Sequence, residues 1–365
     1  MFPRSKKFFG SIKSKLDSLS RYKYFANNLI KKGNLDLDSK NIQVQLSLYS
    51  SYLIERKDWA QLIDLFDKIL ISSTKKTVLF VGNCQVTPLS RIVELSNSYC
   101  SEYHSFNLLP DIHNMAQELQ NIVVDYLLPN TDILVTQNII NKEYPLNTEN
   151  SKNLCRTITI PTLYFAGYYP DIIYLKQNNQ TIRTAPIIDY HSSFILHSFS
   201  EGISENSCIT TLKDGSWIGE NYLQNIENIF DSLYDREREW DVKITDYLYN
   251  NFKEKLLFHT VNHPGSDLLT LVATTLSSLL NLGEFNSNKL LVIPDFLNRT
   301  KWILNKKIAD QLNMDPNTQL KFNINGSSMS VDKFVKTHYT FYRENPTIVK
   351  DNIERCKTQN NKWVN

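Results

Sequence analysis

Short apolar runs alternate with helically spaced apolar residues over residues 77–165. The run 77–81 is almost continuously apolar and is bounded by polar residues, which is typical of a strand buried on both faces of a parallel sheet. Similar runs predict strands at 103–108, 133–135 and 158–165. Strands that alternate with helices predict an α/β fold with a doubly wound, mostly parallel sheet and helices on both of its faces.

Apolar residues at helical spacing predict the helices of this fold. One helix follows the first strand, with Pro88 in its first turn, and another covers 115–128. Residues 217–255 are also predicted to be helical. A strongly apolar helix is expected to begin at Pro264, because proline is favoured at the first helical position, and to end at Gly283.

Four segments are predicted along the chain. Residues 1–32 have the spacing of a basic amphipathic helix, which suits either an anionic membrane surface or a helix packed on the body with a solvated basic face. Residues 33–76 predict a helical hairpin and a polar linker, a packing or docking element. The α/β domain is expected over 77–285, and residues 286–365 are expected to form a C-terminal extension packed on it.

The formal net charge of +2 is unevenly distributed. Residues 1–32 contain nine basic residues and one acid, so the rest of the chain sums to −6. Because a nucleic-acid-binding domain is normally basic over its folded body, no nucleic-acid partner is expected. No run of about 18 apolar residues predicts a membrane span, and the N-terminal apolar patch is too short for a signal peptide. A cytoplasmic protein is expected, and peripheral contact at the inner membrane face through residues 1–32 is one of the two alternatives for that segment.

Several common constellations are absent from the sequence. The five cysteines are scattered without a Cys-x-x-Cys pair, which fits neither a disulfide scaffold nor a zinc site, so reduced thiols and no metal are expected. There is no Walker loop, no G-x-G-x-x-G after a strand, no G-x-S-x-G elbow and no H-E-x-x-H.

Cys84 is the first candidate for chemistry. It follows the strand 77–81 and precedes a helix, the position at which parallel sheets bind ligands. The positive end of the helix dipole should stabilise its thiolate. The backbone N–H groups of the turn Gly82-Asn83-Cys84-Gln85 could bind a phosphate or an oxyanion. The structural alternative is a small buried cysteine in a tight turn.

His263 is the second candidate. It lies at or just before the start of the helix expected from Pro264, where it could act as a general base. The structural alternative is a helix N-cap, a role that Asn262 could share. His259, four residues earlier, is a competing candidate.

Polar groups after other predicted strands and in two loops are further candidates. Side-chain amides after the strand 133–135 could donate to an oxyanion or bind a sugar hydroxyl. The loops 165–171 and 189–192 combine aromatic and polar groups, as carbohydrate and nucleotide pockets do. The residues concerned are Gln137, Asn138, Tyr168, Asp171 and His191. Ordinary polar or aromatic loops are the structural alternative for all of them.

Four of these motifs together resemble a known family. They are Gly82-Asn83-Cys84-Gln85, the strand exit Thr136-Gln137, the segment Pro161…Phe165-Ala166-Gly167-Tyr168…Pro170-Asp171, and Asn262-His263-Pro264. In this order and spacing they resemble the WcbI family of polysaccharide-biosynthesis proteins, over about residues 77–285. The resemblance implies an acetyltransferase that acts on capsule or other surface glycans with coenzyme A. It also implies a site that looks like the SGNH-hydrolase plan, in which a serine holds the position of Cys84.

The resemblance also implies roles for individual residues. Cys84 would be the nucleophile or a cofactor-proximal residue, and His263 the base, with Asp267 as a suggested acid partner. Gln137 or Asn138 would help to hold the oxyanion. Substrate contacts are expected from Asn83, Gln85, Tyr168, Asp171 and His191, and coenzyme A contacts from Gly82, Arg156, Lys176 and Arg183.

Three functions remain open at this point. The first is transfer of an acyl group, expected to be acetyl, from acetyl-CoA to a sugar hydroxyl, for which a covalent acyl-Cys84 step is not required. The second is a glycan esterase or deacetylase of the same plan, which needs no coenzyme A. The third is a non-enzymatic scaffold for glycan assembly that docks through its helical hairpin. Each of the three implies a sugar or glycan partner.

Overall fold

A computed structural model describes residues 37, 39–178, 180–183, 189–282, 293–315 and 317–363. Its contacts divide the chain into two compact units. Unit 1 comprises Met1–Ile160, Trp240–Val242 and Ala273–Leu291, and unit 2 comprises Pro161–Glu239, Lys243–Val272 and Val292–Asn365. The division after Ile160 falls inside the range 77–285 that the sequence suggested as one domain.

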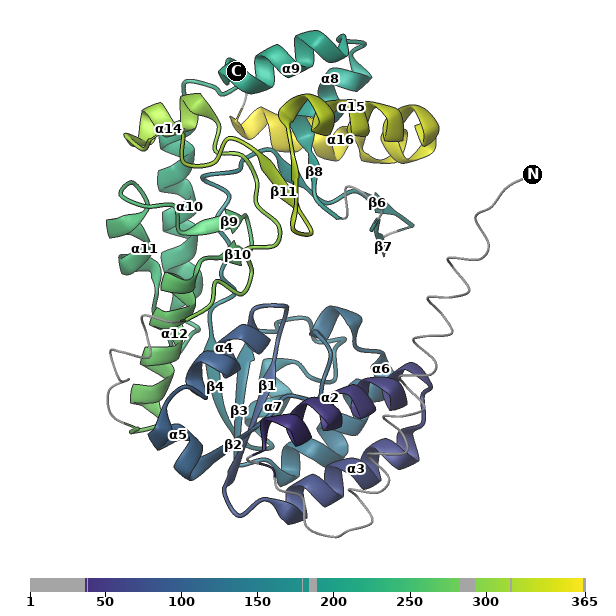
Figure 1. Ribbon diagram of the computed structural model, residues 1–365, viewed down its shortest axis with the longest axis vertical. Helices are drawn as coiled ribbons and strands as arrows, with labels where there is room; N and C mark the ends of the chain where they lie inside the picture. Colours follow the sequence, from purple (N-terminus) through teal and green to yellow (C-terminus); the bar gives the residue numbers. More distant parts are fainter. Residues whose placement is uncertain are drawn as a thin grey trace, which may run out of the picture. The chain divides into compact units, whose positions relative to one another are not determined.

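A four-stranded parallel sheet forms the centre of unit 1, in the order β2-β1-β3-β4 (Figure 1). The strands are β1 (Lys76–Val81), β2 (Tyr103–Phe106), β3 (Ile133–Gln137) and β4 (Arg156–Ile160). Val81 lies beside Thr136, and Gln137 lies beside Ile160, so the carboxyl ends of three strands meet at one edge. The expected mixed α/β architecture with a parallel sheet is thus confirmed.

Helices of unit 1 lie around this sheet. They are α2 (Lys40–Glu55), α3 (Trp59–Ser72), α4 (Val86–Val93), α5 (Asn97–Glu102), α6 (Gln117–Ile122), α7 (Thr148–Lys152) and the short η1 (Ile112–Asn114). Helices α2 and α3 follow one another within the segment 33–76, and Asp58 caps α3 by accepting from the N–H of Gln61. Leu62, Leu65 and Phe66 of α3 share one buried cluster with Leu79 and Val81 of β1. The hairpin is therefore part of the core of unit 1.

Two elements of unit 1 differ from their predicted extents. The predicted helix 115–128 is divided into α6, a π-helical turn η2 (Val123–Leu127) and a 3-10 turn η3 (Leu128–Asn130). The fourth strand ends at Ile160 instead of continuing to residue 165. Asp241, from the returning segment Trp240–Val242, accepts hydrogen bonds from the N–H and the hydroxyl of Thr159. That segment therefore lies along β4.

Unit 2 consists of helices and two-stranded pieces of sheet. Its helices are α8 (Ser193–Ser200), α9 (Glu205–Asp214), α10 (Tyr222–Glu237), α11 (Thr245–Asn251), α14 (Lys306–Leu312), α15 (Val331–Glu344) and α16 (Pro346–Trp363). Its antiparallel strand pairs are β5 (Ile172–Ile173) with β8 (His191–Ser192), β6 (Lys176–Gln177) with β7 (Gln180–Thr181), β9 (Phe258–Thr260) with β10 (His263–Pro264), and β11 (Phe322–Ile324) with β12 (Ser327–Met329).

The C-terminal segment supplies much of the core of unit 2. Helices α15 and α16 pack against α8 (Figure 1). Cys356 and Asn360 of α16 both donate to the carbonyl of Ser193 at the start of α8. The described part of the extension predicted at 286–365 therefore packs on residues that follow Ile160.

The apolar helix after His263 begins later than predicted. Helix α12 spans Ser266–Leu279, whereas Pro264 lies in β10 and has no helical role. Asn281 has a positive φ of 58°, and the N–H of Leu282 donates to the carbonyl of Ser277. A left-handed residue of this kind ends a helix, so Asn281 does here what was expected of Gly283, which lies outside the described residues.

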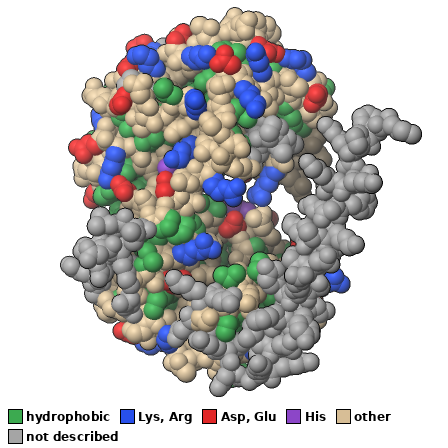
Figure 2. Space-filling model, in the orientation of Figure 1, with side chains coloured by type: hydrophobic (Ala, Val, Ile, Leu, Met, Phe, Trp, Pro, Cys, Tyr) green, Lys and Arg blue, Asp and Glu red, His purple; other side chains and the backbone are tan. Residues whose placement is uncertain are grey.

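Some expectations concern residues that the structure does not describe. They include the basic amphipathic helix at 1–32, the first residues of the segment 33–76, and residues 286–292 at the start of the C-terminal extension. Within the described ranges, none of the helices combines the length and the apolar composition needed to cross a membrane. Lys and Arg side chains are interspersed with Asp and Glu on the face shown in Figure 2.

Candidate active site

Cys84 lies in a short turn that joins the end of β1 to the start of α4. The N–H of Val86 donates to the carbonyl of Asn83 (3.1 Å), which closes the turn directly before the helix. Cys84 is a free cysteine and is only partly buried. The predicted position of the thiol, after a buried strand and before a helix, is thus observed.

Gln137, at the end of β3, holds this turn with its side-chain amide. Its Oε1 accepts from the backbone N–H of Asn83 (2.9 Å). Its Nε2 donates to Oδ1 of Asn83 (3.2 Å) and to Oε1 of Gln85 (2.9 Å). Asn83 Oδ1 also accepts from the backbone N–H of Gln85 (3.0 Å). The two adjacent strands therefore fix the residues on both sides of Cys84.

These bonds change the roles of the amides around Cys84. A primary amide nitrogen carries two hydrogens, and both hydrogens of Gln137 are donated within the turn. Gln137 has none left for an oxyanion, which corrects its predicted role. Asn83 is a half-buried residue, and because its Oδ1 is fixed as an acceptor, its Nδ2 is left as the donor of the amide. Gln85 is buried, with 3% exposure, and its side-chain oxygen bonds to Gln137 within the turn and not to a ligand.

Gly82 is required by the close packing under the turn. A Cβ at this position would lie 2.6 Å from Cγ1 of Val86 and 2.8 Å from Oε1 of Gln137. Its carbonyl accepts from the N–H of Ile112 (2.8 Å). The structure thus assigns Gly82 a packing role, and its predicted contact with coenzyme A stays a prediction.

Two other residues of unit 1 were predicted to take part. Asn138 directly follows Gln137, the last residue of β3, and is partly buried. Arg156 is the first residue of β4, at the edge of the sheet opposite Cys84, and donates to the carbonyl of Leu279 (3.2 Å). The structure does not bring Arg156 to the Cys84 turn.

His263 belongs to unit 2, where Tyr190 contacts its ring. The hydroxyl of Tyr190 donates to Oδ1 of Asn262 (2.8 Å) and lies 3.1 Å from Nε2 of His263. Burial, together with the nearby His259, lowers the pKa of His263 to about 4. His263 is therefore neutral at pH 7, and as a weak base it is poorly suited to remove a proton from a hydroxyl.

His259 has the carboxylate partner that the sequence suggested for His263. Its Nε2 lies 2.8 Å from Oδ1 and from Oδ2 of Asp295. The side chains of the two residues keep 12% and 31% exposure. Asp267, the suggested partner of His263, instead pairs with Nζ of Lys255 at 2.5 Å. The suggestion of a His263–Asp267 pair is wrong.

Three residues predicted to contact substrate lie in the core of unit 2. Tyr168 is fully buried, and its hydroxyl donates to the carbonyl of Phe252 (2.7 Å). His191 is fully buried against His338 and Tyr342, and its burial lowers its pKa well below the usual range. Asp171 accepts from the indole N–H of Trp302 (3.1 Å). Because these side chains are buried within unit 2, we correct their assignment from substrate contact to packing.

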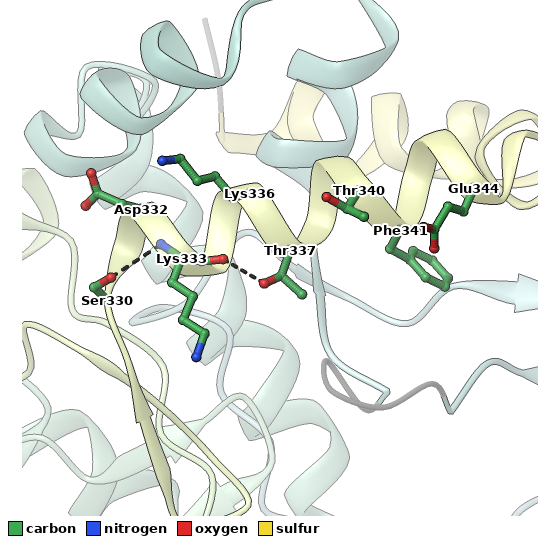
Figure 3. A pocket seen from close by; sticks show the side chains of 8 residues that line it. All are labelled: Ser330, Asp332, Lys333, Lys336, Thr337, Thr340, Phe341 and Glu344. Atoms are coloured by element: carbon green, nitrogen blue, oxygen red, sulfur yellow. Dashed lines mark hydrogen bonds between the residues drawn. The ribbon is translucent and has the colours of Figure 1, made fainter. Parts of the chain in front are cut away.

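The remaining predicted residues of unit 2 are exposed. Lys176 lies in β6 and Arg183 after β7, with side chains at the surface. A groove of about 550 Å³ runs along α15 and is lined by Ser330, Asp332, Lys333, Lys336, Thr337, Thr340, Phe341 and Glu344. Figure 3 shows Lys333 and Lys336 pointing to different sides of the helix. The groove therefore does not gather its positive charges at one point, and none of the candidate residues lines it.

The sequence also matches a family of known proteins. The family described as polysaccharide biosynthesis enzyme WcbI matches residues 77–284. This chain belongs to the WcbI family. The matched range begins at β1 and includes the Cys84 turn, Gln137, His259 and His263, so it takes in candidate residues from both units of this WcbI-family protein.

A solved structure supports the assignment at the level of the fold. It is described as WcbI, a novel polysaccharide biosynthesis enzyme, in its native form without a disulfide bond between coenzyme A and one of its cysteines. It matches with a TM-score of 0.65 and 17% identity, over 79% of this chain and 99% of that chain. The similarity thus extends beyond the range of the family match. The chain matches no curated protein in sequence.

Two residues that contact the candidate histidines were missed by the sequence reasoning. Asp295 is separated from His259 by more than thirty residues and by the whole of α12, and no local pattern connects them. Tyr190 directly precedes the chosen His191. The side chains of neighbouring residues in an extended chain point to opposite sides. This alternation was the signal that could have shown that Tyr190 and His191 face different surroundings.

Proposed function

We propose that this WcbI-family protein transfers an acyl group, in the first instance acetyl, from acetyl-CoA to a sugar hydroxyl in capsular or surface polysaccharide biosynthesis. The observation that carries the proposal is the rigid turn that presents Cys84 at the carboxyl end of β1. Support also comes from the WcbI relative, whose description pairs coenzyme A with a cysteine. We take Cys84 as the cysteine with this role here.

The residues of the turn fit the reactive end of coenzyme A. Cys84 is a free and only partly buried cysteine, so its thiol is the group we assign to contact with the thiol or thioester of coenzyme A. Asn83 Nδ2 is the side-chain donor suited to a thioester oxygen, because Gln137 fixes the orientation of its amide. Bound acetyl-CoA would supply an activated acyl group. The protein would orient that group and stabilise the charge that develops on its oxygen.

Two finer features accompany this proposal. The strand order β2-β1-β3-β4 corresponds to the first four positions of a flavodoxin-like doubly wound sheet, which supports an SGNH-like plan for unit 1. The basic residues at 1–32 would allow peripheral contact with an anionic membrane, where glycans are assembled on lipid carriers.

Binding of coenzyme A tests the proposal directly. Isothermal titration with coenzyme A and acetyl-CoA should give micromolar dissociation constants for the wild type and weaker binding for Cys84→Ala. Incubation with coenzyme A disulfide should attach coenzyme A to Cys84, so Cys84→Ala should gain one coenzyme A fewer than the wild type. Cys100→Ala, which removes an exposed cysteine of α5, is the matched control: it should bind coenzyme A as the wild type does and keep the addition at Cys84.

Other results would favour the alternatives. Absence of binding to either form of coenzyme A would contradict acyl transfer and favour a glycan esterase, which needs no coenzyme A. A Cys84→Ala protein with unchanged ligand binding and unchanged activity would leave Cys84 as a structural residue and favour the scaffold.

A further inference from the structure

Gln137 is a buried polar residue that the sheet of unit 1 places beside the Cys84 turn. Strands β1 and β3 are parallel neighbours, and Val81 lies opposite Thr136, so Gln137 follows at the level of Gly82. Gln137 keeps only 4% exposure. An amide buried to this extent has to find its hydrogen-bond partners within the fold, because an unpaired one costs free energy.

The partners of this amide lie on both sides of Cys84. Its Oε1 accepts from the backbone N–H of Asn83, and its Nε2 donates to Oδ1 of Asn83 and to Oε1 of Gln85. Asn83 precedes Cys84 and Gln85 follows it, so one group holds both neighbours. Gln137 donates both of its amide hydrogens there, and it therefore acts on Cys84 through the residues on either side.

The reactivity of Cys84 depends on how accurately the turn is held. Helix α4 begins at Val86, two residues after Cys84. The positive end of a helix and its unpaired N–H groups stabilise a thiolate only within about the first turn. A shift of about 1 Å in a reacting group can lower a rate by about 100-fold. The side chains that fix the turn therefore also control the chemistry of the thiol.

We propose that Gln137 is a positioning residue for Cys84: as a donor and an acceptor, its amide holds Asn83 and Gln85 so that the thiol stays at the start of α4. This inference rests on the proposed function, but its first readout is the reactivity of the thiol and needs no acyl transfer. With coenzyme A disulfide, the Cys84 thiolate attacks one sulfur as the sulfur–sulfur bond of the reagent breaks. A Cys84–coenzyme A disulfide forms, and the leaving coenzyme A thiolate takes up a proton from water.

The first test compares the rates at which Cys84 reacts with iodoacetamide and with coenzyme A disulfide, followed by mass spectrometry of the peptide that contains it. Gln137→Met keeps the length of the side chain and removes its donor and its acceptor. It should lower both rates at Cys84 by at least about 10-fold. Cys100 in the same protein should react as in the wild type. Gln120→Met is the matched control and should leave both rates unchanged, because Gln120 is a buried glutamine of α6 that donates to the carbonyl of Met115 and not to the turn.

Gln137→Glu adds a readout that a purely structural role would not change. A protonated carboxyl group donates and accepts, and so replaces part of the amide, whereas a carboxylate can only accept. Burial and the facing oxygens of Asn83 and Gln85 favour the protonated form, so the pKa of the new carboxyl should lie above its usual value of about 4. Relative to the wild type, alkylation of Cys84 should be fastest at acid pH and should slow as the pH rises through that pKa. The same ratio for Gln137→Met should not depend on pH.

Each result decides one part of the inference. Wild-type or faster alkylation of Cys84 in Gln137→Met would overturn it, and so would a wild-type protein whose Cys84 does not react with iodoacetamide. Equal rates that do not depend on pH in Gln137→Glu and Gln137→Met would also overturn it. If thermal unfolding shows that Gln137→Met does not fold, the pH dependence of Gln137→Glu decides alone. If iodoacetamide gives the expected pattern but the wild type neither binds coenzyme A nor reacts with its disulfide, acyl transfer is contradicted and the role of Gln137 remains.

Discussion

Asp171 is a buried carboxyl group whose proton affinity depends on the fold. Burial raises its pKa to about 6, against hydrogen bonds from Ser192 and Trp302 that favour the charged form. In the unfolded chain an aspartate has a pKa of about 4. The folded protein therefore keeps the proton over a range in which the unfolded chain has lost it. The contribution of Asp171 to the free energy of unfolding should be fully present below about pH 4 and should be lost as the pH rises through about 6.

Asp171→Asn should remove this pH dependence, because asparagine keeps the oxygen that accepts from Trp302 and carries no charge. Relative to the wild type, the variant should gain up to about 3 kcal/mol of unfolding free energy at neutral pH and little or nothing near pH 4. Urea unfolding at both pH values measures the difference. Asp310→Asn, an exposed aspartate of α14, should show no such change with pH. Equal effects of Asp171→Asn at the two pH values would refute the argument.

The connection between β1 and α4 depends on the absence of a side chain at position 82. In Gly82→Ala the new Cβ would meet Val86 and Gln137 at less than 3 Å, so the turn must shift. We expect a loss of about 1–3 kcal/mol of unfolding free energy and weaker coenzyme A binding, because the Gln137 bonds that orient Asn83 would be strained.

Gly265→Ala is the control for this substitution at the turn. The nearest atom to its Cβ would be a backbone oxygen at 3.5 Å, an ordinary contact, so stability should hardly change. Thermal unfolding and titration with coenzyme A measure both variants. If Gly82→Ala bound coenzyme A as tightly as Gly265→Ala, the close packing under the turn would have no part in cofactor binding.

The elements of unit 1 were largely predictable because their signals are local. The continuous apolar run before Gly82 predicted β1 within one residue, and the spacing of Trp59, Leu62 and Phe66 predicted α3. The start of α12 was misplaced because Pro264 suits both a first helical turn and the end of a short strand. Pairing with β9 decided between them, and that pairing is a tertiary contact.

The candidate site could be predicted only in part. Cys84 was found because its position between strand and helix is visible in the sequence. The hydrogen bonds from Gln137 to the Cys84 turn depend on two strands that end side by side. The His259–Asp295 pair joins segments on either side of α12. Tyr168 and His191 carried polar groups that suggested a pocket. Their burial follows from packing against helices such as α11 and α15, which no local pattern of loop residues reveals.

The division of the whole chain into two units predicts that core defects act within one unit. Phe66 of α3 packs edge-on against Phe106 in unit 1, and Phe334 of α15 stacks on Phe322 in unit 2. Both phenyl rings are buried, at 0% and 1% exposure. Substitution of either by alanine should cost about 3–5 kcal/mol, because it removes the same buried group and leaves a cavity.

Hydrogen exchange followed by mass spectrometry can locate each loss. Phe66→Ala should speed exchange in α2, α3 and β1 while α15 and α16 stay protected, and Phe334→Ala should do the reverse. The two variants serve as controls for each other, since the same side chain is removed from each core. Equal loss of protection in both sets of helices after either substitution would mean that the chain unfolds as one cooperative body. The Cys84 turn and the His259–Asp295 pair would then share a single stability, and Phe334→Ala would weaken coenzyme A binding as strongly as Phe66→Ala does.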